Sequence, residues 1–158
     1  MGLPRTFVGF SSTDIGHYRL MQAWKANQHI DFNFTDCQLS SEINSENEQY
    51  IKRKCSERIN MAGKYVLLIG QDTKNKHKYV RWEAEVAIEK KCTIIGANLD
   101  GSRSMQRDTC PPIIREIGAM FVPYSPKIIA YAIKNYEMHD DDDYYHYKDH
   151  IYKELGYD

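Results

Sequence analysis

The chain has 158 residues, of which 42% are hydrophobic and 27% are charged, and its formal net charge is −1 at pH 7. This length and composition fit a single folded globular domain. A net charge so close to zero gives no field that would gather nucleic acid or an anionic membrane surface. No apolar run reaches the roughly 20 residues that a membrane-spanning helix needs. Nucleic acid and membranes are therefore not expected as partners.

The four cysteines, Cys37, Cys55, Cys92 and Cys110, are far apart and form no Cys-x-x-Cys pair. This spacing favours free thiols in a reducing cytoplasm over a disulfide or zinc framework. The first residues also lack the apolar stretch of a signal peptide. We therefore expect a cytoplasmic protein.

Taken in chain order, strand-like and helix-like patterns alternate. Strands are predicted at residues 6–10, 32–34, 65–69, 93–95 and 119–122. Helical patterns occur at residues 17–28, 51–59, 79–91, 113–117 and from Pro126 onward. Residues 40–47 fit either a solvated loop or the start of the second helix. The alternation predicts an α/β fold: a doubly wound, flavodoxin-like sheet of about five parallel strands with helices on both faces.

Residues 64–96 form the predicted centre of this fold. Two continuous apolar runs, 65–69 and 93–95, are each closed by a glycine, as expected for strands that are buried on both faces. The helical pattern between them makes this segment a right-handed βαβ unit.

Glu83 falls on the predicted buried side of the helix in this unit. Val80, Ala84 and Ala87 recur at helical spacing, and Glu83 lies three residues after Val80 and four before Ala87. Glu85, about 200° further around the axis, is predicted to point to solvent. A carboxylate in the first turn beyond a strand's carboxyl end would lie in the crevice where open α/β sheets bind ligands. From position alone, Glu83 could equally cap the helix and favour its dipole.

The last 22 residues differ in amino-acid composition from the rest, so we expect a domain at 1–136 and an extension at 137–158. Four successive aspartates, 140–143, precede a tyrosine-rich pattern typical of an amphipathic helix. We expect this helix to pack on the domain or on a partner chain. His146 and His150 have a spacing that could bind a metal on one helix face. Such a pair is more often solvated, and no metal is expected.

Several common ligand-binding motifs are absent. The chain contains neither Gly-x-Gly-x-x-Gly after the first strand nor Gly-x-x-x-x-Gly-Lys-Ser/Thr, so the standard dinucleotide and P-loop cradles are missing. A response regulator would need a phosphoacceptor aspartate after the third strand, where this chain has Ile69-Gly70-Gln71.

Four blocks carry a family resemblance. Residues 7–14 (FVGFSSTD), 34–39 (FTDCQL), 66–73 (VLLIGQDT) and 79–83 (YVRWE) occur in this order. Together they resemble the V-F-x-S-F-x-x-x-D, F-x-D-x-S-L, V-L-I-G-x-x-T and W-V-x-x-E segments of bacterial TIR-like domains. By pattern they look like the ThsB proteins of Thoeris anti-phage systems. The chain departs from these segments at Gly9 and Gln38, where the family often has serine.

The resemblance implies an enzyme that cleaves the nicotinamide–ribose bond of NAD+. NAD+ would be the substrate, with no further cofactor, and an ADP-ribose-derived product (linear, cyclic or conjugated) would be sensed by a separate effector protein. The family glutamate falls on Glu83, which would be the catalytic residue. The implied substrate-binding residues are Phe10, Ser11, Asp14, Asp36, Gly70, Thr73 and Trp82.

Two alternative functions remain open at this point. One is a non-catalytic TIR scaffold that signals by self-association. The other is a glycosyl-transfer protein related to nucleoside deoxyribosyltransferases, which would also use a carboxylate. Release of nicotinamide from NAD+, or of a free base from a nucleoside, separates the two enzymes.

Overall fold

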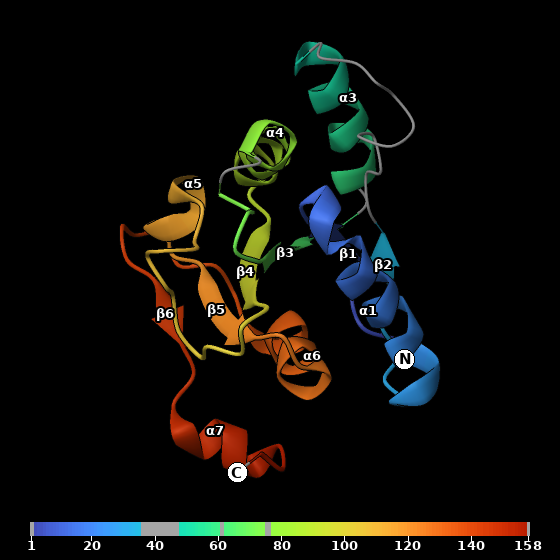
Figure 1. Cartoon of the computed structure of the whole chain (residues 1–158), viewed down its shortest axis with the longest axis vertical. Coiled ribbons are helices and arrows are strands. Elements are labelled where there is room, and N and C mark those ends of the chain that lie inside the picture. Colours follow the sequence, from blue (N-terminus) through green and yellow to red (C-terminus); the bar gives the residue numbers. More distant parts are fainter. Residues whose placement is uncertain (1, 36–47, 61, 75–76, 158) are drawn as a thin grey trace.

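The computed structural model describes residues 2–35, 48–60, 62–74 and 77–157, and its centre is a six-stranded sheet (Figure 1). The strands are β1 (Thr6–Gly9), β2 (Phe34–Thr35), β3 (Lys64–Ile69), β4 (Thr93–Asn98), β5 (Met120–Pro123) and β6 (Tyr145–His146). Their order is β2-β1-β3-β4-β5-β6, and each neighbouring pair is parallel. The doubly wound, flavodoxin-like α/β fold is thus confirmed, with six strands where about five were expected.

Helices cover both faces of the sheet (Figure 1). One face carries α1 (Ile15–Asn27), α6 (Pro126–Asn135) and α7 (Asp149–Glu154), whose buried residues form one apolar cluster with the strands. The other face carries α3 (Glu48–Ile59), α4 (His77–Glu89) and α5 (Pro112–Arg115), which contribute to a second cluster. The sheet is therefore the middle layer between two apolar cores.

Strand β3 shows how the sequence serves both cores. Tyr65, Leu67 and Ile69 belong to the cluster under α3 and α4, whereas Val66 and Leu68 belong to the cluster under α1 and α6. None of these five side chains is more than 2% exposed. Because successive side chains of a strand point to opposite faces, a strand between two helical layers must be apolar throughout. The prediction of a central strand at 65–69 is confirmed.

The C-terminal tail corrects the expectation of one amphipathic helix. Its residues Tyr145 and His146 form β6, with Tyr145 opposite Met120, and only α7 is helical. Gly118 N donates to Asp143 O at 2.7 Å, and Tyr145 N donates to Ala119 O at 2.9 Å. These backbone bonds favour an extended tail. They also place His146 in β6 and His150 in α7, so the expectation that both lie on one helix is wrong.

The tail also holds loops that follow β4 and β5. The guanidinium of Arg103 lies 4.1 Å from the ring centroid of Tyr152, which is 1% exposed. The Tyr157 hydroxyl lies 2.5 Å from Ser125 Oγ and accepts a hydrogen bond from Ile128 N at 3.1 Å. It thereby satisfies an N–H group in the first turn of α6 that has no intrahelical partner.

Helices α1 and α4, which flank the candidate site residues, begin earlier than predicted. Helix α1 begins at Ile15, directly after the 3₁₀ turn Ser12–Asp14, and tolerates Gly16 inside its first turn. Helix α4 begins at His77, two residues before the predicted start. Residues 74–78 contain no proline or glycine that would delay the helix. Glu83 therefore lies in the second turn of α4, not in the first.

Among the described residues, no helix combines the length and apolar character that crossing a membrane requires. Cys55, Cys92 and Cys110 are buried free thiols, as predicted. Burial raises the pKa of the Cys110 thiol to about 12. Cys37 lies outside the described residues.

The burial of β3 yields a stability prediction. Leu68→Ala should lower the free energy of unfolding by about 2–5 kcal/mol, because it removes a fully buried side chain and leaves a cavity. Leu20→Ala, on the exposed side of α1 where Leu20 is 46% exposed, should change it by no more than about 0.5 kcal/mol. Urea unfolding of both variants measures the difference. Equal losses would contradict the two-core packing.

Candidate functional site

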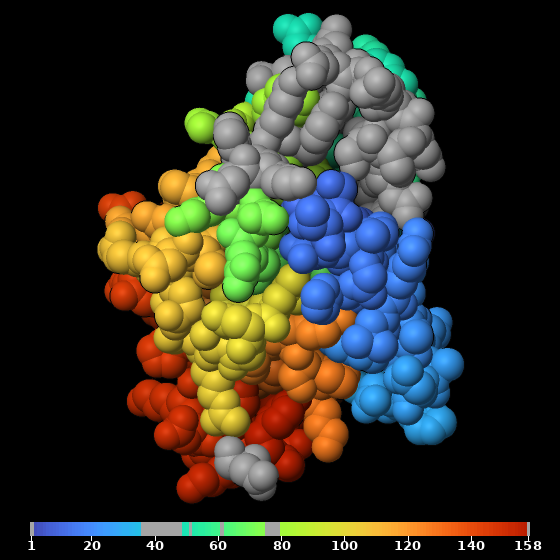
Figure 2. Space-filling model, in the orientation of Figure 1, coloured from blue at the N-terminus to red at the C-terminus, as the bar shows by residue number. Residues whose placement is uncertain are grey.

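The candidate site lies where β1 and β3 are neighbours. Strand β2 lies on one side of β1 and strand β3 on the other, so the chain reverses its direction across the sheet between these strands. In doubly wound sheets, ligands bind beyond the carboxyl ends of the strands at such a reversal. Figure 2 shows the segments that follow β1 (blue) and β3 (green) beside each other on one face, next to the segment that follows β4 (yellow).

Asp14, Gly70 and Thr73 come together at this point. A Cβ atom added to Gly70 would lie 2.7 Å from Asp14 Oδ2 and 3.1 Å from Oδ1, so the carboxyl group lies over the bare Cα of Gly70. Gly70 N donates to Thr73 Oγ1 at 2.8 Å, and Thr73 Oγ1 donates to Leu68 O at 3.3 Å. Thr73 is fully buried. The hydroxyl of Thr73 thus fixes the turn that gives Asp14 its place.

Burial raises the pKa of the Asp14 carboxyl above its usual range. His17 opposes this rise through its charge, Asp72 adds to it by repulsion, and a hydrogen bond with Thr73 lowers the pKa. Asp14 Oδ2 is buried and finds no hydrogen-bond donor among the described residues. The protein therefore supplies only part of the hydrogen bonding that this carboxylate would have in water.

Phe10 and Ser11 begin the short turn that ends at Asp14. The half-buried ring of Phe10 stacks on Tyr18, with ring centroids 4.8 Å apart. Ser11 is 2% exposed, and its Oγ lies 3.0 Å from Thr13 Oγ1. Asp14 N donates to Ser11 O at 2.8 Å, which closes the short turn and directs Asp14 toward β3.

Glu83 and Trp82 lie on α4, the helix that follows this turn in the chain, and each is 8% exposed. Trp82 belongs to the apolar cluster under α3, α4 and α5, together with Val86. More of the surface of α4 is buried than the predicted apolar stripe alone, because α3 and α5 contact this helix in addition to the sheet. Convergence of Glu83 and Trp82 on Asp14 stays a prediction.

The expectation that Glu85 points to solvent is only partly right, because 30% of its side chain is exposed but its carboxylate is held by two cations. Its carboxylate forms an ion pair with Lys52 of α3 and accepts a hydrogen bond from Arg81 Nε at 2.9 Å. The hydrogen bond from Lys52 is the largest cause of the lowered pKa of Glu85. Glu85 therefore ties α4 to α3 beside the sheet.

Asp36 lies outside the described residues, so its place in the site stays a prediction. Sequence reasoning also overlooked Tyr124, which follows β5. Its hydroxyl donates to His17 O at 2.6 Å, and its ring packs edge-on against the His17 ring at 5.3 Å. Tyr124 thus fastens the start of α1, next to Asp14. A tyrosine directly after a buried strand was the available signal.

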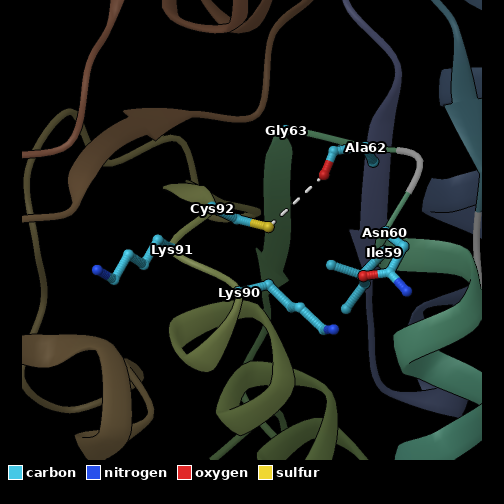
Figure 3. A pocket seen from close by; sticks show the side chains of 7 residues that line it. All are labelled: Ile59, Asn60, Ala62, Gly63, Lys90, Lys91 and Cys92. Atoms are coloured by element: carbon cyan, nitrogen blue, oxygen red, sulfur yellow. Dashed lines mark hydrogen bonds between the residues drawn. The ribbon is translucent and has the colours of Figure 1, made fainter.

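A pocket of about 300 Å³ lies at the opposite edge of the sheet, where β3 and β4 begin and α3 and α4 end. Figure 3 shows its lining residues, with the Lys90 side chain directed toward Asn60 and that of Lys91 directed away. The Cys92 thiol donates to Ala62 O at 3.6 Å, and burial raises the pKa of this thiol. A protonated thiol is no nucleophile. This pocket therefore offers no chemistry comparable to that near Asp14.

No metal site competes with this assignment within the described part of the chain. No group of three or more His, Cys, Asp or Glu side chains there could hold a metal ion. Asp14 and Asp72 are near enough to repel each other electrostatically, yet no third metal ligand joins them among these residues.

A family description, the TIR-like domain of the Thoeris protein ThsB, matches residues 7–104, more than half of the 158 residues. The chain belongs to this family. The matched region begins at the second residue of β1, extends past β4 and contains all of the predicted site residues of this ThsB-type protein. No curated protein sequence matches the chain.

Gly9 is a position at which the corresponding segment of this family often has serine. A Cβ atom on Gly9 would overlap with the hydroxyl end of Tyr65. The buried tyrosine of β3 therefore fills the space that a side chain on β1 would need. In this ThsB-type protein a serine at position 9 would require the Tyr65 ring to shift.

The contact between Asp14 and Gly70 yields a second prediction. Gly70→Ala should lower the free energy of unfolding by about 1–3 kcal/mol, because its methyl group would displace the buried carboxyl group. Gly16→Ala is the matched control: nothing lies within 4 Å of the new Cβ in α1, so it should stabilise the protein by about 0.5–1 kcal/mol. Thermal unfolding of both variants tests the opposite signs. A neutral Gly70→Ala protein would contradict the close approach.

The ion pairs of Glu85 yield a pH prediction. The folded-state pKa of Glu85 is lowered, so its contribution is present above the ordinary value of 4.5 and is lost as the pH falls through the folded value. Wild type should exceed Glu85→Gln in unfolding free energy by at most about 1 kcal/mol at pH 7, because both charged side chains are 30% exposed. Urea unfolding of wild type and Glu85→Gln at pH 7 and at pH 3.5 measures this difference in unfolding free energy. A difference that grows in acid would refute the pairing.

Proposed function

We propose that this ThsB-type protein cleaves the nicotinamide–ribose bond of NAD+ and converts the remaining ADP-ribose into a nucleotide signal during anti-phage defence. Membership of the ThsB TIR-like family supports the defence role. The observation that carries the enzymatic proposal is Glu83. This residue is only 8% exposed and lies on the helix that follows the turn after β3.

The chemistry of the bond explains why one carboxylate could suffice. Breaking the bond develops positive charge on the ribose, as in the oxocarbenium-like transition state of glycoside hydrolysis. A carboxylate held near the ribose stabilises that charge most strongly where water is excluded. Nicotinamide leaves as a neutral group from a cationic ring, so no general acid is needed. The low exposure of Glu83 supports one of these points, the exclusion of water from the carboxylate.

The other site residues have supporting roles in this proposal. Phe10 offers an aromatic face, while Ser11, Asp14 and Thr73 offer polar groups at the turn beyond β1 and β3. Gly70 allows a close approach to the backbone. Trp82 would shield Glu83 from water, and Asp36 would complete the polar wall. NAD+ is the substrate in this scheme and no further cofactor takes part.

The product would act through a separate effector protein, as the Thoeris family suggests. A transferable nucleotide requires that the ribosyl cation be captured by water, by a group of the same molecule or by another acceptor. These routes give linear, cyclic and conjugated ADP-ribose respectively. Mass spectrometry of nucleotides from infected cells distinguishes them by mass and fragmentation. Self-association of the protein would be compatible with each route.

The proposal predicts a loss of function that is specific to Glu83. Glu83→Gln should reduce nicotinamide release at least about 100-fold and abolish phage protection, because the amide keeps the shape but not the charge. Glu85→Gln should keep both, since its carboxylate already pairs with Lys52 and Arg81. The readouts are nicotinamide and NAD+ levels and plaque counts in infected cells, where a phage trigger is present.

Protein abundance must be equal in the two strains, because a cap role for Glu83 would act only through stability. Full protection by the Glu83→Gln protein at normal abundance would exclude the enzyme and favour the scaffold. Release of a free base from nucleosides, with no nicotinamide from NAD+, would favour the glycosyl-transfer alternative.

A further inference from the structure

The Oδ2 atom of Asp14 is a buried acceptor without a donor among the described residues. Buried polar atoms nearly always have a hydrogen-bond partner, and each exception requires an explanation. An unsatisfied charged group costs more than a neutral one. A ligand that brings its own donor would remove this cost on binding.

The surroundings of Asp14 restrict where that donor can come from. Gly70 N already donates to Thr73 Oγ1, and the single hydroxyl hydrogen of Thr73 is shared between Leu68 O and the Asp14 carboxyl group, which leaves Oδ2 without a donor. Gly70 itself contributes no side chain, and any side chain there would collide with the carboxyl group. The turns after β1 and β3 therefore hold the carboxylate in place without supplying all of its hydrogen bonds.

The surrounding charge restricts what the donor can be. Asp72 repels negative charge at this position, and His17 is the group whose charge opposes that effect. A phosphate placed against Asp14 would face two carboxylates. A neutral hydroxyl group supplies the missing hydrogen bond and adds no negative charge.

We propose that Asp14 is a specificity-determining residue whose Oδ2 accepts a hydrogen bond from one ribose hydroxyl of the dinucleotide. This inference rests on the proposed function for the identity of the ligand. Its consequence is selectivity: a dinucleotide that lacks this hydroxyl, or carries a phosphate on it, binds more weakly. Asp14 positions the substrate and takes no part in breaking the bond.

The test is a thermodynamic cycle in the binding of carba-NAD+, in which a methylene replaces the ribose ring oxygen and prevents cleavage. Isothermal titration calorimetry compares carba-NAD+ with its four single-deoxy analogues, each lacking one ribose hydroxyl. With wild type, one analogue should bind about 10- to 100-fold more weakly, as expected for a hydrogen bond to a charged group. With Asp14→Asn, carba-NAD+ should lose affinity similarly, and removal of that hydroxyl should cost little more.

Asp72→Asn is the matched control, because it removes a nearby exposed carboxylate that is not assigned a ligand contact. Its affinities should stay within about threefold of wild type, the scale of a screened surface charge. Thermal unfolding of Asp14→Asn checks that the fold is kept. A merely structural role would weaken all five ligands alike and would overturn the assignment.

Two further outcomes would also overturn it. One is Mg²⁺ binding in the absence of nucleotide that Asp14→Asn abolishes, since this would make the carboxylate a metal ligand. The other is a wild-type protein that releases nicotinamide in infected cells but shows no hydroxyl-specific loss of affinity, which refutes the role of Asp14 alone. Absence of both nicotinamide release and carba-NAD+ binding refutes the proposed function together with this inference.

Discussion

The pairing of β1 with β3 is the constraint on which the rest of this structure depends. Residues far apart in the chain meet there, with Gly9 opposite Leu67 at the end of the shared register. The pairing brings the turn after β1 to the turn after β3, and the missing side chain of Gly70 leaves room for the Asp14 carboxyl group. Close packing of this kind is specific because a single added methyl group on Gly70 would displace the carboxyl group of Asp14.

Helix α4 links this region to the outer layer. It packs on the sheet through Ala84 and Ala87 and faces α3 through Glu85, which pairs with Lys52. Two glutamates two residues apart therefore experience different surroundings: Glu85 is held by cations, whereas Glu83 is buried at 8% exposure. Such separation lets one helix carry a structural carboxylate and a candidate catalytic one.

Sequence patterns predicted the parts of the fold that depend on local periodicity. The apolar run at 65–69 identified β3 because burial on both faces leaves no polar position. Glu83 could be distinguished because it interrupts a regular apolar stripe. The contact of Asp14 with Gly70 could not be predicted, since it depends on the register of two strands that are distant in sequence.

The failures have physical causes as well. Strand β6 consists of two residues and is held mainly by backbone hydrogen bonds, so its side chains carry little periodic signal. The pairing of the partly exposed Glu85 with Lys52 was missed because helical phase accounts for the sheet but not for a neighbouring helix. Packing between α3 and α4 is a tertiary effect that no single helical pattern reveals.

The parallel sheet has a consequence for the order in which the protein assembles. No two neighbouring strands can be joined by a hairpin, because each parallel pair needs a crossover. β3 and β4 are separated only by α4 and its short connections, whereas β1 must find β3 across the whole of the segment from residue 10 to residue 63. Loop closure over longer segments costs more entropy. We expect the β3–α4–β4 unit to form first, with Glu83 already on it, and β1 to dock later with Asp14. A partly folded chain would then hold only half of the site, and the NAD+ cleavage that we propose would begin only once folding is complete.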